Sequence, residues 1–362
     1  MKIAILGTRG IPNNYGGFEQ FAEIFAVYLT EKKHDVYVYN SHKHIYKEKN
    51  YKGVNIIHQY DPEYKIGTVG QFIYDLNCIL DSRNRNFDII LQLGYTSNSI
   101  WSFLLPKKSI IITNMDGLEW KRTKYSKLIQ RFLKFAEKKA VKSSDYLVAD
   151  SLGIKKYLKE KYNTEAAYIA YGADLFSDPK EEVLSQYNVE KNNYNLLIAR
   201  FEPENNIEVI LDGIAESQDN KVMLVIGSND NSYGDYLKKK FYNYRNIRFI
   251  GGVYNKVHLD NLRYFSNLYF HGHSVGGTNP SLLEAMATKA LIVAHNNEFN
   301  RAILQQNAFY FSNAECIKHL IKTIKRKDYE NIVEDNFKTI IQEFNWNKIN
   351  ESYFRLFEKS LK

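Results

Sequence analysis

The segment GGTNPSLLEAMA, residues 276–287, joins a glycine turn directly to the start of a helix. Asn279 is a suitable N-cap, and Pro280 suits the first helical position, where its missing N–H costs nothing. The positive end of a helix dipole and its unpaired amides attract anions, so this segment predicts a site for a nucleotide diphosphate. The amides expected to face outward are those of Thr278, Asn279, Ser281 and Leu282.

Glu284 lies about one turn inside the same helix. A carboxylate at that position can accept hydrogen bonds from a ribose diol. The alternative interpretation is a capped amphipathic helix with a solvent-facing glutamate, since capped helices are far commoner than phosphate sites.

Outside this segment, short apolar runs alternate with helix-patterned stretches, which predicts parallel, doubly wound sheets. The pattern breaks into polar residues near 176–193 and then restarts, so two lobes are expected. The predicted domains are residues 1–176, residues 177–340 and a final amphipathic segment at 341–362. The expected strands are 2–6, 35–39, 54–58, 87–93, 109–113, 145–149 and 167–169 in the first lobe, and 194–199, 222–227, 247–250, 268–271 and 290–294 in the second; the expected first-lobe helices are 18–30, 69–80 and 127–141.

Of the 362 residues, 44% are hydrophobic and 25% are charged, a composition typical of a folded globular protein. Cys78 and Cys316 lie far apart and have no zinc-like spacing, which favours a reducing compartment such as the cytoplasm. No apolar run is long enough to span a membrane. The formal net charge is +8, and the whole excess lies in residues 1–176.

Much of this positive charge falls between Trp120 and Lys142, where lysines and arginines interleave with Leu, Ile and Phe. This pattern predicts a basic amphipathic helix. Such a helix can lie on an anionic membrane surface or on nucleic acid, and a solvated helix has the same appearance.

A glycine-rich loop, GTRGIPNNYGG, follows the first strand at residues 7–17. It lacks the G-x-G-x-x-G spacing, and residues 39–41 offer no acid for an adenine ribose, so a dehydrogenase is disfavoured. The loop lies where α/β proteins place ligands, and the Arg9 guanidinium could meet a substrate or a phosphate there. The alternative is a loop whose glycines serve only tight turns.

Two further residues follow predicted strands and could carry chemistry. Arg200 is expected to emerge at the same edge as the turn at Gly276 and to clamp a phosphate, or else to pair with Glu202 or Glu204. Asp116 could orient an acceptor hydroxyl or take its proton, and an Asp-Gly turn without chemistry is nearly as well supported.

Three histidines, His271, His273 and His295, follow strands of the second lobe. Their spacing offers no third metal ligand, so we expect them to line a polar groove and predict no metal site.

With these motifs, the chain resembles retaining glycosyltransferases of family 4, which have the GT-B fold. The motifs at residues 7–19, 116–122 and 200–206 are similar to those of a bacterial subgroup that contains capsular rhamnosyltransferases. The resemblance implies an α/β fold with two Rossmann-like, doubly wound lobes facing a cleft. It also implies that the C-terminal helix crosses back to the first, acceptor-binding lobe and that the second lobe binds the nucleotide sugar.

The resemblance carries roles over to named residues. It implies catalytic or phosphate roles for Arg200, for Asn205 in the place of a family lysine, and for Asp116 near the usual histidine. Members of the family usually carry two glutamates eight positions apart. Glu284 matches the second, which binds the nucleotide ribose, whereas the position of the first is occupied by Gly276. The residues implied to bind the donor are Gly276, Gly277, Thr278, Asn279, Ser281 and Glu284, and those implied on the substrate side are Arg9, Gly10, Tyr15, Gly16, Gly17, Glu119 and His273.

The activity that the resemblance implies is sugar transfer with retention, in the synthesis of capsule or O-antigen polysaccharide. The donor would be a nucleotide-diphosphate sugar such as dTDP-rhamnose, used as a co-substrate without another cofactor. Independently of the resemblance, the sequence has no Asp-x-Asp pair to hold a divalent ion against a diphosphate, which predicts activity without metal. The acceptor would be a glycan or an undecaprenyl-diphosphate-linked saccharide, reached from the cytoplasm or from the inner face of the plasma membrane. The alternatives are a GT-B nucleotide-sugar epimerase, an inactive member of an assembly complex, or a basic nucleic-acid-binding protein, which the neutral second lobe disfavours.

Overall fold

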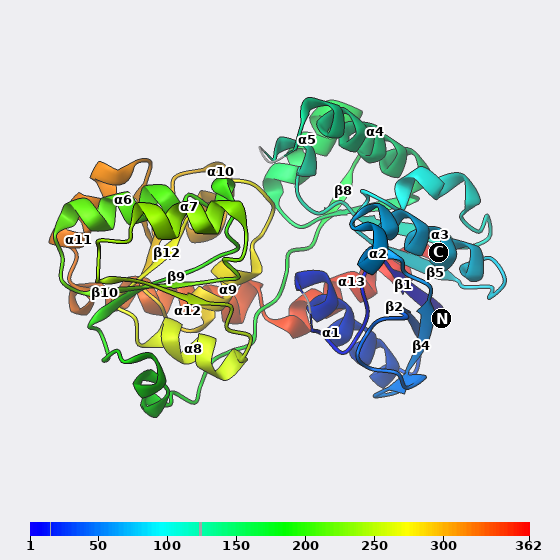
Figure 1. Ribbon diagram of the computed structural model, residues 1–362. Helices are drawn as coiled ribbons and strands as arrows, with labels where there is room; N and C mark the ends of the chain where they lie inside the picture. Colours follow the sequence, from blue (N-terminus) through cyan, green and yellow to red (C-terminus); the bar gives the residue numbers. More distant parts are fainter. Residues whose placement is uncertain (15, 123–124) are drawn as a thin grey trace. The chain divides into compact units, whose positions relative to one another are not determined.

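The computed structural model describes residues 1–14, 16–122 and 125–362, and these residues form two compact units (Figure 1). Unit 1 comprises Met1–Lys121, Tyr125–Tyr171 and Trp346–Lys362. Unit 2 comprises Gly172–Asn345 together with Arg122–Lys124, of which only Arg122 is described. Within the described ranges, no helix is both long enough and apolar enough to cross a bilayer.

Unit 1 is built on an eight-stranded sheet in the order β3-β4-β2-β1-β5-β6-β7-β8. All neighbouring pairs are parallel except β3 and β4, which form an antiparallel pair. The strands are β1 (Lys2–Leu6), β2 (Asp35–Ser41), β3 (Asn50–Tyr51), β4 (Val54–Gln59), β5 (Ile89–Leu93), β6 (Ile110–Asn114), β7 (Tyr146–Ala149) and β8 (Ala166–Tyr168).

Helices and short 3-10 turns (η) cover this sheet. β5 is buried along its whole length, as expected of a parallel strand covered on both faces. The helical elements of unit 1 are α1 (Gly17–Glu31), α2 (Glu63–Ile66), α3 (Val69–Ser82), η1 (Ser99–Leu104), η2 (Glu119–Lys121), α4 (Lys127–Ser143), α5 (Leu152–Tyr162) and α13 (Trp346–Ser360).

The C-terminal helix α13 belongs to unit 1, where its aromatic face packs on α1. Tyr353 lies between Phe21 and Phe25, with ring centroids 4.7 and 5.3 Å away, and Phe357 contacts Phe25 at 5.5 Å. Tyr353 also accepts a hydrogen bond from Asn114 at 2.8 Å. The last helix of the chain is therefore tied to the end of β6.

Unit 2 is built on a six-stranded, all-parallel sheet in the order β11-β10-β9-β12-β13-β14. Helices cover both of its faces: α6, α7 and α11 lie on one, and α8, α9 and α12 on the other (Figure 1). The strands are β9 (Tyr194–Ile198), β10 (Val222–Ile226), β11 (Ile247–Gly251), β12 (Leu268–His271), β13 (Ile292–His295) and β14 (Phe309–Phe311). The helical elements are η3 (Glu181–Tyr187), η4 (Pro203–Asn205), α6 (Ile207–Ser217), α7 (Ser232–Lys240), α8 (Lys256–Tyr264), α9 (Pro280–Ala287), α10 (Glu298–Leu304), α11 (Ala314–Thr323), η5 (Arg326–Asp328) and α12 (Glu330–Glu343).

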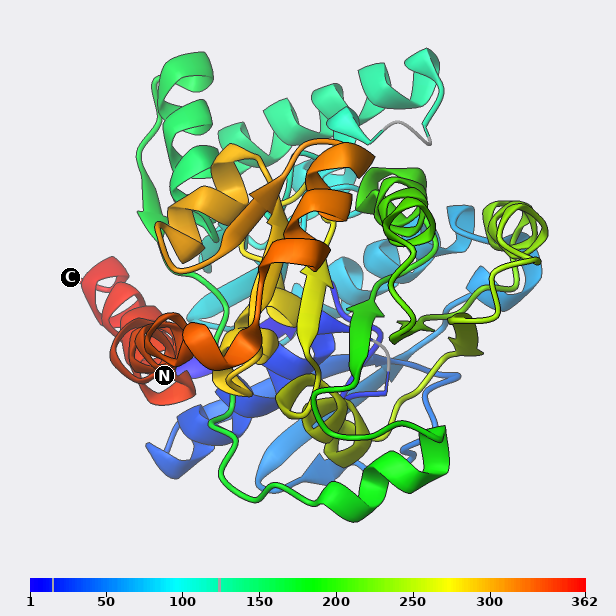
Figure 2. The ribbon, with the colours of Figure 1, turned by 90° about the vertical axis from the view of Figure 1, so that its left-hand side faces the viewer.

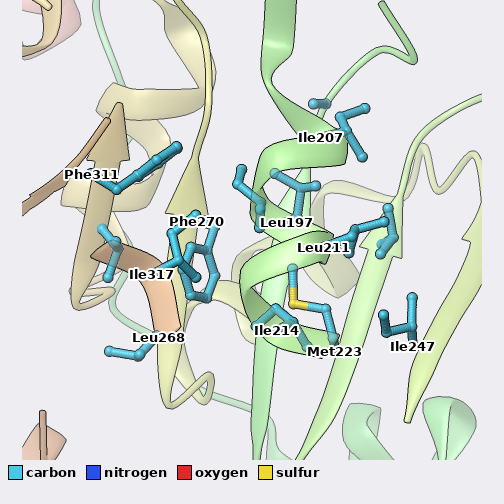
Figure 3. Packing of buried hydrophobic residues seen from close by; sticks show 14 of the residues in the cluster. Leu197, Ile207, Leu211, Ile214, Met223, Ile247, Leu268, Phe270, Phe311 and Ile317 are labelled. Atoms are coloured by element: carbon cyan, nitrogen blue, oxygen red, sulfur yellow. The ribbon is translucent and has the colours of Figure 1, made fainter. Parts of the chain in front are cut away.

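The core of unit 2 follows from the sequence pattern of α6 and its strands (Figure 3). Ile207, Leu211 and Ile214 recur at helical spacing and are buried against Leu197 of β9 and Phe270 of β12. This packing holds the carboxyl ends of β9 and β12 in place, where the site of unit 2 is built.

The expected fold class is confirmed: the chain has two lobes with parallel sheets, and the predicted strands all form. Two short strands, β3 and β14, carry no recognisable pattern and were not predicted. The basic segment 120–142 is not one helix, because η2 ends at Lys121 and α4 begins only at Lys127, where Ser126 caps it. Residues 123 and 124 of that prediction lie outside the described part of the chain.

Candidate functional site

The strand order of unit 2 reverses direction between β9 and β12, which are neighbours in the sheet. Ligands of open α/β sheets bind at such a switch point, beyond the carboxyl ends of the strands. Arg200 follows β9 at this edge, and the segment that leads into α9 follows β12. The fold therefore brings the two predicted phosphate-binding motifs to one edge of one sheet.

Three hydrogen bonds tie these two loops together. Asn206 donates its side-chain amide to the Gly272 carbonyl at 2.7 Å. Ser274 donates both its backbone amide, at 3.1 Å, and its hydroxyl, at 2.7 Å, to the carbonyl of Glu204. The loop after β9 is thus fixed against the loop after β12.

Arg200 is exposed, and its guanidinium forms no ion pair within the described residues. Its backbone is held firmly, because its carbonyl accepts a hydrogen bond from the Asn205 side chain at 2.7 Å. The alternative pairing with Glu204 does not form: Glu204 lies 3.5 Å from the guanidinium of Arg122. Arg200 therefore keeps its charge available at this edge, while one N–H of Asn205 is used inside the loop.

His273 and His271 stack on each other, with ring centroids 4.4 Å apart. Burial and then the charges of Arg200 and Arg122 lower the pKa of His273 to about 3. Burial and the neighbouring His273 hold the pKa of His271 well below its usual range. Both imidazoles are therefore neutral at physiological pH and add no positive charge at this edge.

The start of α9 differs in detail from the prediction. Asn279 caps the helix, as expected, with its side chain accepting from the amide of Ser281 at 2.9 Å. The amide of Leu282 donates to the Asn279 carbonyl at 3.0 Å. The prediction of outward, unbonded amides at Ser281 and Leu282 is therefore wrong, because the cap itself satisfies them.

The unbonded amides lie earlier in the turn. Those of Gly276, Gly277 and Asn279 have no acceptor within the described part of the chain. Gly276 adopts φ = 130°, a conformation that L side chains rarely adopt, and a Cβ added there would meet nothing within 4 Å. The glycine is thus needed for the backbone conformation, which leaves space beside the turn. Thr278, the remaining member of the predicted set, is buried.

Glu284 is not a solvent-facing glutamate. Its carboxylate accepts a hydrogen bond from the guanidinium of Arg263 at 2.5 Å, and its side chain is 25% exposed. Arg263 is 2% exposed and also bonds Asp260 at 3.2 Å and Ser281 at 3.4 Å. The hydroxyl of Ser281 in turn lies 2.8 Å from that of Tyr269. A buried ion pair therefore orients the one carboxylate that the sequence assigned to a ribose.

Arg263 was missed by the sequence analysis. An arginine near the end of a short helix normally reaches solvent, and only the i,i+3 spacing from Asp260 hinted at an internal pair. Its partnership with Glu284 depends on the packing of α8 on α9.

In unit 1 the strand order reverses between β1 and β5, and the glycine loop follows β1. Gly10 has φ = 125°, and a Cβ there would lie 2.3 Å from the Asn40 side chain. That side chain is buried and bonds both the amide of Ile11, at 3.0 Å, and its carbonyl, at 2.8 Å. The loop is therefore locked against β2 rather than being a loose turn.

Arg9 forms a bidentate ion pair with Glu63, at 3.0 and 2.7 Å, and its amide donates to Glu19 at 2.8 Å. Gly16 and Gly17 form the start of α1, where the carbonyl of Gly16 accepts the first helical hydrogen bond. Tyr15, also predicted to contact substrate, lies outside the described residues. The Arg9 guanidinium is thus held by a carboxylate at this edge.

Asp75 is a buried carboxyl that the sequence analysis did not single out. It accepts a hydrogen bond from the hydroxyl of Ser97, which lies in the segment after β5. Burial raises the pKa of Asp75 to about 7, although the Ser97 hydroxyl opposes the shift. No sequence signal marks it, because an aspartate on an amphipathic helix usually faces water.

Asp116 follows β6 with φ = 48°, and its amide donates to the Asn114 side chain at 2.9 Å. Glu119, which begins η2, donates its amide to the Gly117 carbonyl at 2.9 Å. Trp120 donates its indole N–H to the buried Glu137 at 3.1 Å. Glu137 also accepts hydrogen bonds from Tyr157, Lys161 and Tyr162, so this cage anchors the 116–120 segment to α4 and α5.

Comparisons with known proteins agree with this architecture. Residues 179–339 match the family described as "Glycosyl transferases group 1", and residues 1–174 match "Domain of unknown function (DUF1972)". No curated protein matches the chain.

Among solved structures, the sucrose-phosphate synthase (tll1590) of Thermosynechococcus elongatus superposes with a TM-score of 0.80 at 14% identity, covering 99% of each chain. Anabaena Alr3699/HepE, in complex with UDP and glucose, has a TM-score of 0.76 at 16% identity and covers 99% of this chain and 100% of its own. A glycosyltransferase from Rickettsia africae ESF-5 has a TM-score of 0.74 at 17% identity, covering 100% of this chain and 99% of its own.

The chain therefore has the two-lobed fold of GT-B glycosyltransferases, and its second half carries a domain of glycosyl transferases group 1. Arg200, the turn at Gly276 and Glu284 all fall within that domain.

Proposed function

We propose that this protein is a glycosyltransferase that moves a sugar from a nucleotide-diphosphate donor to a saccharide acceptor. The observation that carries the proposal is the set of groups at one sheet edge of the group 1 domain. The exposed guanidinium of Arg200, the unbonded amides of Gly276, Gly277 and Asn279, and the ion-paired Glu284 are groups suited to a diphosphate and a ribose.

In the reaction, the bond between the anomeric carbon and the diphosphate oxygen breaks, and a bond to the acceptor oxygen forms. Negative charge develops on the departing diphosphate, so Arg200 and the turn amides stabilise the transition state more than the ground state. The acceptor proton passes to the leaving phosphate oxygen on the same face of the sugar, and configuration is retained. Asp116 then serves to orient the acceptor hydroxyl.

The finer assignments extend this proposal. HepE, a protein of similar fold, is described in complex with UDP-glucose, which supports a nucleotide-sugar donor. Gly276 replaces a family glutamate with open space, which suits a donor other than glucose, and we propose a 6-deoxyhexose such as L-rhamnose. The acceptor is a glycan or lipid-linked saccharide in cell-surface polysaccharide synthesis, met in the cytoplasm by unit 1 through the edge that holds Arg9, Gly10 and Glu119.

A thermal-shift panel of UDP-, dTDP- and GDP-sugars tests the donor assignment. A ligand present at about a hundredfold its dissociation constant adds about 2.7 kcal/mol of stability, so a true donor gives a clear shift. Absence of any shift would refute a nucleotide-sugar site, and would be the result expected of an inactive member of an assembly complex.

Turnover then separates the remaining alternatives. Release of the nucleoside diphosphate should require a saccharide acceptor and should persist in excess chelator. Conversion of the sugar without an acceptor would indicate an epimerase instead. Loss of activity in chelator, with rescue by magnesium or manganese, would contradict the metal-independent mechanism.

A further inference from the structure

The helix α4 exposes an apolar stripe rather than burying all of its large side chains. Leu128 is 76% exposed, Phe135 50% and Phe132 36%, and these residues recur at i, i+4 and i+7 on one face. The buried face of α4 is formed by other residues, namely Leu133, Ala136, Glu137 and Ala140. In both ribbon views α4 lies at the margin of its unit (Figures 1 and 2).

Neighbouring elements of unit 1 extend the stripe. Phe132 contacts the ring of Phe72 on α3 at 5.7 Å. The turn η1 packs against α4 and carries Phe103, which is 70% exposed. Leu128, Ile129, Phe132 and Phe135, together with Arg131, line a hollow of about 540 Å³. We call the surface formed by Leu128, Ile129, Phe132 and Phe135 the α4 patch.

Along α4, cations accompany the patch and no acid is exposed. α4 carries six basic residues, and its only acid, Glu137, is buried in the cage that holds Trp120. None of the six forms an ion pair within the described ranges of the chain. They are Lys127, Arg131, Lys134, Lys138, Lys139 and Lys142.

From these observations we propose that the α4 patch docks unit 1 onto an anionic lipid surface. The charge complementarity is specific to that occupant: the cations meet acidic headgroups, and the exposed Leu and Phe side chains enter the boundary of the acyl chains. A second copy of this chain would bring the same positive charge to the contact and be repelled. Nucleic acid would meet the cations but leave the apolar stripe without a partner.

The proposal stands apart from sugar transfer, because it concerns binding and not turnover. If the acceptor is lipid-linked, docking would bring unit 1 to the surface that holds it. If the protein binds vesicles but transfers no sugar, the docking proposal stands and only the proposed glycosyltransferase function is refuted.

Sedimentation of the full chain with vesicles tests the docking surface. The probes are phosphatidylcholine vesicles with and without phosphatidylglycerol, at low and high salt. We expect binding only to the acidic vesicles, weakened by salt. Each cation near such a surface contributes roughly fivefold in affinity, so the Lys138→Gln/Lys142→Gln variant should bind about 25-fold more weakly.

Two further variants separate the apolar contribution from general charge. Leu128→Ser/Phe135→Ser alters the exposed stripe and keeps every cation, and we expect it to lose most of the binding while its circular dichroism is unchanged. Lys322→Gln/Lys325→Gln removes the same charge from exposed positions of unit 2 and should bind as the wild type does.

Three results would overturn the proposal. The first is equal binding to neutral and acidic vesicles, or binding to neither. The second is binding that the Leu128→Ser/Phe135→Ser variant retains in full. The third is a concentration-dependent dimer, or tight salt-dependent binding to random-sequence DNA, that the α4 variants abolish, since the patch would then serve a different partner.

Discussion

Replacing Arg263 with methionine should weaken nucleotide binding indirectly. We expect Arg263 to orient the carboxylate of Glu284 and not to contact the nucleotide itself. Arg263 is 2% exposed and bonds the carboxylate of Glu284 at 2.5 Å and that of Asp260 at 3.2 Å. Breaking a buried pair by removing one partner costs about 3–5 kcal/mol. Glu284 is 25% exposed and Asp260 keeps its contact with Lys256, so we expect the lower end of that cost, about 3 kcal/mol in the free energy of unfolding.

The effect on binding follows from the orientation of the carboxylate. A hydrogen bond to a charged acceptor contributes about 1.5–3 kcal/mol. If Glu284 is no longer held toward the proposed ribose, about half of this is lost, which corresponds to roughly four- to twelvefold weaker binding. The measurement is the dissociation constant, by calorimetry, of the nucleotide sugar that gives the largest thermal shift with the wild type, together with urea unfolding.

Two comparisons make the result specific. Arg326→Met removes an arginine of the same unit whose hydrogen bonds, within the described residues, go to backbone carbonyls at 3.0 and 2.7 Å, so it should lower stability and leave nucleotide binding unchanged. Combining Arg263→Met with Glu284→Gln should weaken binding no further than Glu284→Gln alone. Additive losses, or an unchanged dissociation constant in Arg263→Met when Glu284→Gln binds weakly, would refute the positioning role.

Three other predictions concern the two sheet edges. Arg200→Ala should lower kcat by roughly two orders of magnitude or more, by analogy with removing one oxyanion donor, and near-normal turnover would remove Arg200 from the site. The pKa of His273 falls to about 3 on folding, so the unfolded state binds the extra proton between pH 6.5 and 3, and acidification destabilises the fold. Going from pH 6.5 to 5 should cost about 2 kcal/mol, and His273→Asn should flatten that slope in urea unfolding; an unchanged slope would contradict it. For Asp75 the sign is opposite. Its pKa rises from 3.8 to about 7 on folding, so stability is lost progressively as the pH rises from 3.8 to about 7, and Asp75→Asn should raise the unfolding midpoint at pH 8 but not at pH 4. Equal effects of Asp75→Asn at both pH values would argue against this titration.

Much of the fold could be predicted because its signals are local. Strands such as β1 and β12 are apolar runs that need only their own residues to be recognised, and their alternation with helices predicts parallel sheets. β3 and β14 were not predicted, because neither short segment shows a strand pattern of its own, and each forms by pairing with β4 or β13.

The candidate site divides in the same way. The cap at Asn279 could be predicted, because the capping hydrogen bond spans only two residues. Which backbone amides of the turn stay without an acceptor could not, because that depends on which amides the side chain and carbonyl of Asn279 bind in the folded structure. The availability of Arg200 required knowing that Glu204 meets Arg122 instead.

By itself, the sequence determined the two lobes, the strand edge at which Arg200 and the turn at Gly276 lie, and the basic character of α4. Only the tertiary structure decided that Arg263 holds Glu284, that Arg9 is held by Glu63, and that Leu128 and Phe135 face solvent. The physical reason is range. Capping, periodicity and turn geometry act over a few residues, whereas a buried ion pair or an exposed apolar face depends on which distant elements the fold packs together.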